Sequence, residues 1–406
     1  MNQKNAATLT LVQLILPLYL PTFLLSVAQS TMIPVLPLFA DSFHAGYGWI
    51  GLVLAGESIG MLVGDIPAGM LQRKYGARTT MLFGVLIWAL SAICQYFSGH
   101  IALIFLFQMI GGFGFSFYGM GRLLMISERL AAENRGQAVS LIGGVFRMGR
   151  VIGPVTGGLF AGHFELRSAY LFFFAIVMLT FVVVRLFMPQ IYPVDAEHTS
   201  TKLKHVFKGQ ASVFLTAGTG QFLLSLLRSG PRVIIPLYGA NMLGLGVDQI
   251  GSIISIAAIL DVALFIPAGW IMDHLGRKFS VIPSVALLGL CLFLIPFTGG
   301  YMGLLWAAIV GGVGNGISSG FIMTMGADLA PQAIRGEFLG IWRLIGDGGT
   351  TSSPLILGGL ADLVSLAHTS WIMSAFGLVA VVLFAFRVPE TLKAPIWRRR
   401  KRIIRS

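Results

Sequence analysis

The side chains best suited to chemistry in this chain are charged residues that stand inside long apolar stretches. The acids are Glu57, Asp261 and Asp347, and the arginines are Arg122, Arg147, Arg150, Arg228, Arg232 and Arg343. Ionisable side chains are rare and costly in a membrane interior, so each is a candidate for function. The alternative for each residue taken singly is structural pairing, such as Arg343 with Asp347 one helical turn away.

The three acids are suited to carrying protons. Burial disfavours the charged form of a carboxyl group, so a buried acid can exchange protons near neutral pH. Glu57 and Asp261 are the first candidates for proton coupling. Asp347 is the third, because we expect Arg343 to hold it in its ionised form.

The arginines predict contact with a negatively charged group. A guanidinium group does not lose its proton on burial, and six arginines face three acids here. The arginines in excess of the acids need water, backbone carbonyls or an anionic ligand as partners. We therefore expect some of Arg147, Arg150, Arg228 and Arg232 to contact a substrate with an anionic or zwitterionic group, with Arg122 and Arg343 as further candidates. Uncharged groups at similar depth, such as Gln29, Gln221 and Asn315, either line a cavity or form hydrogen bonds between helices.

The composition indicates which elements position these residues. Hydrophobic residues make up 56% of the chain and charged residues only 11%, against about a quarter charged in soluble proteins. Apolar runs of about 20 residues recur, long enough to span a bilayer as helices. They do not alternate as the strands of a membrane barrel do. The sequence therefore predicts an all-α integral membrane protein.

The basic residues are unevenly distributed among the loops. The net charge is +12, but positive residues gather in alternate loops, as at Arg73, Lys74 and Arg78, and in the tail from Arg398 to Arg405. This pattern places both termini in the cytoplasm of a multi-pass protein of the plasma membrane, the bacterial inner membrane. We expect membrane lipids as partners of the tail, no nucleic acid, and a monomer.

An internal repeat organises the chain. The segment Ile66–Gly69 recurs 200 positions later as Ile266–Gly269. At the same offset, Gly111 and Gly112 match Gly311 and Gly312, and Pro154 matches Pro354. The prediction is a tandem duplication: a six-helix half at 1–190, a cytoplasmic linker at 191–211, a second half at 212–390 and a basic tail at 391–406. Such halves enclose a cavity near the midplane of the membrane.

One loop motif occurs in both halves. The second-half copy holds Gly269, Asp273, Gly276, Arg277 and Lys278. The first-half copy holds Gly69, Arg73 and Gly76, with Arg73 at the position of the aspartate. Glycines there permit a tight turn and close helix contact.

The second-half copy resembles the signature G-x-x-x-D-R/K-x-G-R-K of the major facilitator superfamily, and the resemblance covers nearly the whole chain. It implies a fold of twelve transmembrane helices in two pseudo-symmetric halves. It also implies that Asp273 pairs with neighbouring basic residues and helps to latch the halves together.

A second motif lies in the predicted fifth helix and holds Gly149, Gly153, Pro154, Gly157 and Gly158. It resembles g-x-x-x-G-P-x-x-G-G, which marks the drug:proton antiporters of that superfamily. Glycines four apart give a smooth packing face, and Pro154 bends the helix, which suits a part of a gate. Arg150 is an unusual residue inside this motif.

The leading interpretation is a secondary active transporter that works by alternating access and exports a small organic solute or drug in exchange for protons. The alternatives are uptake of an organic anion or phosphorylated solute, and a sensor or scaffold that has kept the fold without transport. An enzyme is not expected, because there is no zinc-type spacing, nucleophile elbow or phosphate-binding loop. We expect no cofactor and no metal, with a proton gradient as the driving force.

Overall fold

The chain folds as two compact units in a computed structural model that describes residues 12–130, 132–193 and 209–392. Of these residues, unit 1 contains those up to 193 together with 246–255, and unit 2 contains 209–245 and 256–392. The predicted boundaries at residues 190, 211 and 390 stay predictions. Residues 194–208 of the predicted linker and 393–406 of the predicted tail lie outside the described residues.

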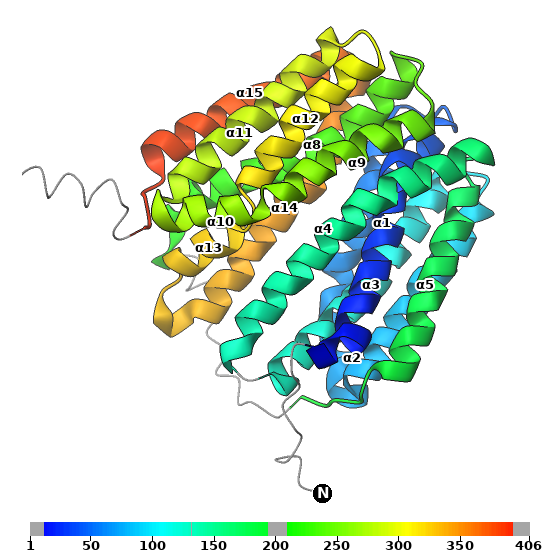
Figure 1. Ribbon diagram of the computed structural model, residues 1–406. Helices are drawn as coiled ribbons and strands as arrows, with labels where there is room; N and C mark the ends of the chain where they lie inside the picture. Colours follow the sequence, from blue (N-terminus) through cyan, green and yellow to red (C-terminus); the bar gives the residue numbers. More distant parts are fainter. Residues whose placement is uncertain (1–11, 131, 194–208, 393–406) are drawn as a thin grey trace, which may run out of the picture. The chain divides into compact units, whose positions relative to one another are not determined.

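All regular elements in the described part of unit 1 are helices (Figure 1). They are α1 (Leu20–Asp41), α2 (Tyr47–Tyr96), α3 (Ile101–Arg129), α4 (Ala132–His163) and α5 (Ser168–Phe187). A 3-10 turn (Val12–Leu14) and a π-helical turn (Ile15–Tyr19) precede α1. Gly76 interrupts α2 with a φ of 77°, a backbone conformation that residues with a Cβ rarely adopt. The long helix α2 is therefore two helices joined by a sharp turn.

Unit 2 is helical in the same way. Its main helices are α8 (Thr219–Asn241), α9 (Val247–Ala263), α10 (Phe265–His274), α11 (Arg277–Leu294), α12 (Tyr301–Ile317), α13 (Phe321–Leu329), α14 (Arg335–Leu363) and α15 (Leu366–Val382). Short elements extend them: α7 (Ala211–Val213), 3-10 turns at Ile295–Phe297 and Gln332–Ile334, and π-helical turns at Phe214–Gly218 and Leu383–Arg387. The first turns of α9, up to Ser255, belong to unit 1.

The helices are sufficient for twelve membrane spans. Within the described ranges, nine helical stretches are long and apolar enough to cross a bilayer. One of them, Tyr47–Tyr96, is divided at Gly76 into two spans. Two further long helices, α8 and α14, carry charged residues such as Arg228 and Asp347 and pack against each other in unit 2. The prediction of twelve transmembrane helices is confirmed.

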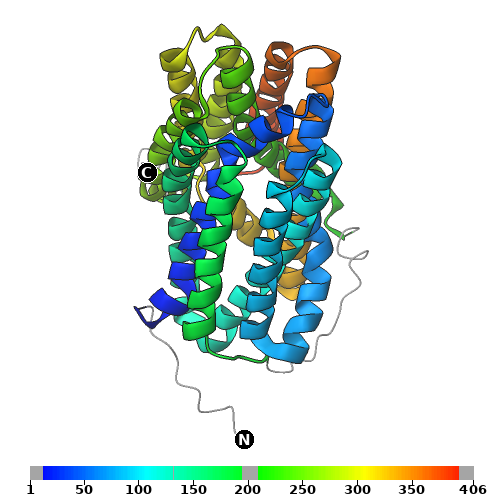
Figure 2. The same ribbon diagram turned by 90° about the vertical axis from the view of Figure 1, so that its right-hand side faces the viewer.

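The same helix pairs pack together in both units, which confirms the internal repeat. In unit 1, α1 packs on α4 and α5, and α2 packs on α5. Figure 2 shows α1 and α5 side by side, as Figure 1 does. In unit 2, α8 packs on α14 and α15, and α11 packs on α15.

A stripe of glycines brings α4 against α1. The glycines are Gly149, Gly153 and Gly157, and they meet Ser26, Ser30 and Thr31 of α1. A Cβ at any of the three would collide with atoms of α1. The predicted smooth packing face is therefore present, and small residues let the two backbones approach closely.

The other side of this motif packs on the first turns of α9. Gly158 meets Val247 and Gly251, and the Pro154 carbonyl lies against Gly251. Pro154 has no N–H, and the next residue, Val155, donates its N–H to Ser255 Oγ at 2.9 Å. One main-chain donor of α4 thus bonds to a neighbouring helix at the proline. The predicted gating role of Pro154 stays a prediction.

We expect Gly153→Leu to destabilise the protein, because the added side chain would push α4 away from α1. Overpacking of this kind costs about 1–3 kcal/mol. The melting temperature of purified protein in detergent measures the effect. The matched control is Gly144→Leu on the same helix, where no described atom of unit 1 lies within 4 Å of a Cβ. Equal melting temperatures for the two variants would contradict the packing argument.

Candidate functional site

Glu57 lies on α2 at the wall of a polar pocket in unit 1. Gln29 of α1 donates a hydrogen bond from Nε2 to Oε1 of Glu57 at 2.9 Å. Gln95, Gln108 and Tyr170 line the same pocket. A carboxyl group in a polar pocket inside a helical bundle can bind and release a proton.

Asp261 is the corresponding acid of unit 2. It lies near the end of α9, is 5% exposed, and accepts a hydrogen bond from Asn315 Nδ2 of α12 at 2.9 Å. Each unit therefore holds one acid of its second span with a side-chain amide, although Gln29 is on α1 and Asn315 on α12. Both amides form hydrogen bonds between helices, and Gln29 also lines the pocket of Glu57, so both roles left open are observed for it. Gln221 likewise donates to the Trp342 carbonyl at 2.9 Å.

Asp347 and Arg343 form an ion pair within α14. Arg343 Nε lies 3.4 Å from Asp347 Oδ2, and the side chains are 61% and 48% exposed within the protein. The expected pairing one turn apart is confirmed. The pair is much less buried than Asp261.

Arg228 of α8 stabilises a break in the tenth span. Its Nη2 donates to the Ser318 carbonyl at 2.7 Å and to Ser318 Oγ at 2.6 Å. Helix α12 ends at Ile317, Gly320 has a φ of 82°, and α13 begins at Phe321. A cation at the carbonyl end of a helix is favourable. The predicted contact of Arg228 with a substrate stays a prediction, and its observed role is to bind Ser318 at the break between α12 and α13.

Arg122 of α3 lies among aromatic rings of unit 1. Its guanidinium carbon is 5.1 Å from the ring centre of Phe146 on α4 and 5.8 Å from that of Tyr118. The Tyr118 hydroxyl is 2.9 Å from Thr22 Oγ1 of α1. Arg122 therefore connects α3 with the segment of α4 that precedes Arg147.

The remaining arginines are half-buried. Arg147 and Arg150 lie one turn apart on α4, on either side of Gly149, and Arg232 lies one turn beyond Arg228 on α8. Their predicted role in substrate binding stays a prediction.

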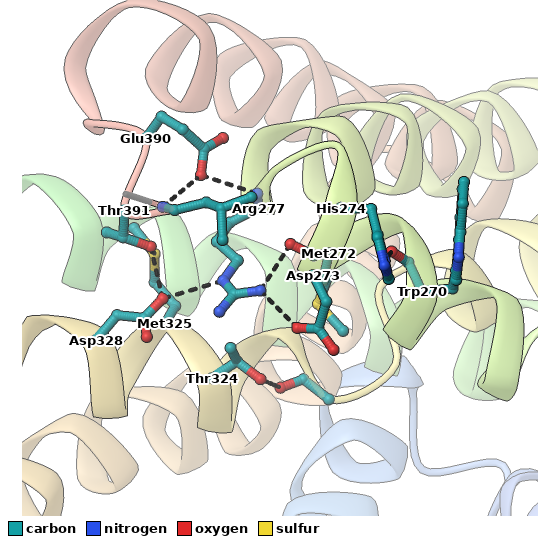
Figure 3. Close-up of polar contacts among 12 residues, drawn as sticks. Trp270, Met272, Asp273, His274, Arg277, Thr324, Met325, Asp328, Glu390 and Thr391 are labelled. Atoms are coloured by element: carbon teal, nitrogen blue, oxygen red, sulfur yellow. Dashed lines mark hydrogen bonds and ion pairs between the residues drawn. The ribbon is translucent and has the colours of Figure 1, made fainter. Parts of the chain in front are cut away.

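The loop motif of unit 2 is built around Arg277 (Figure 3). Arg277 Nη1 donates to Asp273 Oδ1 at 2.9 Å and to the Met272 carbonyl at 2.6 Å. Arg277 Nε donates to Asp328 Oδ2 of α13 at 3.0 Å, and Thr391 Oγ1 donates to the same oxygen at 2.7 Å. The expected pairing of Asp273 with a basic residue is confirmed, while Asp328 is a partner that the motif did not predict.

Glu390 caps the start of α11 in the same cluster. It accepts main-chain hydrogen bonds from Arg277 at 2.9 Å, from Lys278 at 3.0 Å and from Leu392 at 3.0 Å. A carboxylate at a helix N-terminus satisfies free N–H groups and favours the helix dipole. Lys278 Nζ instead donates to the Ala385 carbonyl at 2.8 Å.

Unit 1 holds its loop without a carboxylate at the position of Glu390, and the Arg78 guanidinium donates to the Arg185 carbonyl there. The residue 200 positions before Glu390 is Gln190, whose Nε2 donates to the Tyr75 carbonyl and to Thr79 Oγ1. Ala77 donates its N–H to the Ile191 carbonyl at 2.7 Å. Arg73, at the position of Asp273, is exposed. The repeat offset was the signal that could have identified this glutamine and glutamate.

The motif glycines differ in role. Gly76 and Gly276 have φ values of 77° and 132°, and a Cβ would meet Gln190 or Glu390 respectively. The predicted tight turn is therefore confirmed at these two positions. At Gly69 and Gly269 no described atom of the same unit lies within 4 Å of a Cβ, so close helix contact within the unit is not their role.

We expect Glu390→Ala to lower the melting temperature, because three main-chain donors would lose their acceptor. Leaving such donors unsatisfied costs about 1–3 kcal/mol. Glu390→Gln keeps one acceptor oxygen and should cost less. Glu165→Gln, in an exposed loop, is the control and should leave the melting temperature unchanged. A melting temperature of Glu390→Ala equal to that of this control would rule out the capping role.

Comparison with curated proteins finds distant relatives that are named for different compounds. Multidrug resistance protein 2 of Bacillus subtilis is 22% identical over 61% of this chain and 64% of its own length. The class H tetracycline resistance protein of Pasteurella multocida is 23% identical over 94% and 98%. A probable galactarate/D-glucarate transporter of Escherichia coli is 22% identical over 84% and 85%.

The fold also has solved counterparts. The crystal structure of a D-xylose-proton symporter superposes with a TM-score of 0.74 at 16% identity, covering 95% of this chain and 99% of the other. The profile of the Major Facilitator Superfamily matches residues 18–219 and again 217–403, once for each six-helix half. With twelve spans, two equivalent units and a loop motif around Asp273 and Arg277, this chain belongs to the Major Facilitator Superfamily and is a transporter rather than an enzyme.

Proposed function

We propose that this protein exports a small organic solute in exchange for protons, by alternating access between the two sides of the membrane. The observation that carries the proposal is Glu57, a carboxylate deep in the helices of unit 1 with a neutral amide partner, Gln29. The glycine-proline motif of α4 supports the direction, as do the two relatives that are named for drug resistance.

Protonation of Glu57 would change how α1 and α2 hold together. The ionised carboxylate accepts a hydrogen bond from Gln29, and hydrogen bonds to charged groups are about twice as strong as neutral ones. A bound proton weakens that bond and removes a charge from unit 1. The proton therefore favours a different conformation, which is what coupling to transport requires. Asp261 with Asn315 has the same chemistry in unit 2.

We expect Glu57→Gln or Asp261→Asn to uncouple transport from the pH gradient. The assay is accumulation in everted vesicles that are acidified inside, with tetracycline, D-glucarate, D-xylose and a cationic dye as probes. In the variants, accumulation should fall to the level without a gradient, while exchange of labelled for unlabelled probe continues. Glu165→Gln should behave as the wild type. Uphill transport by both acid variants would sink the proposal.

The second candidate function is uptake of an organic anion or a phosphorylated solute. It is favoured by the arginines, since Arg147 and Arg150 are half-buried one turn apart on α4 and Arg228 and Arg232 on α8. A guanidinium group presents several donors to a carboxylate or phosphate. The relative named for galactarate and D-glucarate supports this alternative.

If the substrate is anionic, Arg147→Gln and Arg228→Gln should each abolish its binding. A shift in melting temperature with D-glucarate or a sugar phosphate is the readout. Because Arg228 also holds Ser318, the loss must be judged against Arg228→Lys, which keeps the charge. Arg167→Gln, in the exposed loop at 164–167, is the control. Undiminished binding in both glutamine variants contradicts the anionic substrate.

We propose further that the protein is a monomer of the bacterial inner membrane with both termini in the cytoplasm, and that it needs no cofactor beyond the proton gradient. Light scattering of the purified protein in detergent measures whether it is a monomer. Labelling of Gly99→Cys in intact cells by an impermeant thiol reagent tests the orientation, because this topology places the loop at 97–100 outside.

A further inference from the structure

A polar pocket lies wholly inside unit 1, between α1, α2, α3 and α5. Together with the solvent space at its mouth, it has an empty volume of about 340 Å³. Its polar lining consists of Gln29, Glu57, Gln95, Gln108 and Tyr170. Trp88 and Phe173 line it as well and pack edge to face, with ring centroids 5.2 Å apart. Polar side chains and apolar ones such as Met32 and Leu36 therefore line the pocket together.

Two polar atoms at this pocket have no protein partner. Gln95 is 4% exposed and Tyr170 is 1% exposed, yet Oε1 of Gln95 and the Tyr170 hydroxyl bond to no described protein atom. Buried polar groups in folded proteins nearly always have a partner, either protein or ordered water. The space open to the centre of a water molecule is about 30 Å³, and a cavity needs roughly 10–15 Å³ of such space to hold one water. Water in the pocket is therefore the partner that fits both an acceptor and a hydroxyl.

The lining reaches from one end of unit 1 to its middle. Gln95 is the residue before the end of α2, and Tyr170 is the third residue of α5. Glu57 is ten residues from the start of α2, which is about 15 Å along a helix and about half of a 30 Å hydrocarbon core. The loops at 42–46, 97–100 and 164–167 join the helices at this same end.

We infer that this pocket is a water-filled path that carries protons between the end of unit 1 bearing those three loops and the carboxylate of Glu57. The inference rests on the proposed proton coupling and assigns its entry route. A hydronium ion in the pocket transfers one proton to a carboxylate oxygen of Glu57. One O–H bond of the hydronium breaks, one O–H bond forms on Glu57, and a neutral water remains. Release is the reverse step.

The groups that face Glu57 leave this exchange to water. Gln29 of α1, Gln108 of α3 and Tyr170 of α5 line the pocket with it, as do Trp88 and Gln95 from the part of α2 beyond the turn at Gly76. Among the ten residues that line the pocket, Tyr170 is the one other titratable group, and none is a lysine, arginine or histidine. No lysine, arginine or histidine in the lining balances the charge of the Glu57 carboxylate. Whether Glu57 carries a proton therefore depends on the water that reaches it.

Thiol accessibility tests the path without any substrate. The background carries Cys94→Ser and Cys291→Ser, and Glu57→Cys is added to it. A small impermeant cationic methanethiosulfonate is applied to one side of oriented vesicles at a time. We expect Glu57→Cys to react from the same side as Gly99→Cys in the loop at 97–100. Ala92→Trp should fill the pocket and slow the reaction at least about tenfold, because close-packed side chains exclude solvent.

Leu90→Trp is the matched control. Leu90 lies on the same helix but is 53% exposed, so a tryptophan there leaves the pocket open and the rate unchanged. If Ala92→Trp fails to fold, Ala92→Leu fills the space with less bulk. Reaction of Glu57→Cys from the opposite side only, or at a rate that neither filling variant changes, overturns the path. Proton-driven transport by the wild type would still stand in that case, so the two failures are distinguishable.

Discussion

Close contact between helix backbones is the constraint on which the rest of this structure depends. A bilayer offers no water to the peptide groups, so each span must satisfy its own hydrogen bonds as a helix. Lipid tails are as apolar as leucine, so helices adhere by packing closely through small residues rather than by the hydrophobic effect. The Gly149–Gly157 stripe against α1 meets this requirement, and so does Gly112, where a Cβ would collide with the main chain of Glu57.

Polar side chains are then placed where the close packing leaves room. Asp261 pairs with Asn315 and Glu57 with Gln29, each across two helices of one unit. The Arg228 guanidinium satisfies the carbonyl at the broken end of α12. A buried charge with a hydrogen-bonding partner is tolerated, whereas one without a partner is strongly unfavourable. The groups suited to function are therefore also part of what holds each unit together.

The two units share a frame and differ in charge. Both units turn at a glycine with positive φ, Gly76 or Gly276. In both, the residue that holds this turn directly follows a proline, and that proline comes after the last span of the unit. In unit 2 this residue is Glu390, beside the ion pairs of Arg277. In unit 1 it is Gln190, and Arg73 replaces the aspartate. Carboxylates thus take part in holding one turn, whereas the Gln190 amide and the Arg78 guanidinium bond to main-chain carbonyls at the other.

The sequence by itself determined the class of fold, the duplication and the positions of the intramembrane charges, because span length, repeat offset and residue type are local properties of the chain. It also placed the turns at Gly76 and Gly276, while the pairing of Asp273 came from the resemblance to the family. Only the tertiary structure decided that Asp328 and Glu390 complete the Arg277 cluster, and that Gln95, Gln108 and Tyr170 gather around Glu57. These partners come from segments distant in sequence, Glu390 from the chain beyond the last helix. Which segments meet depends on how the helices pack, which a linear pattern does not record.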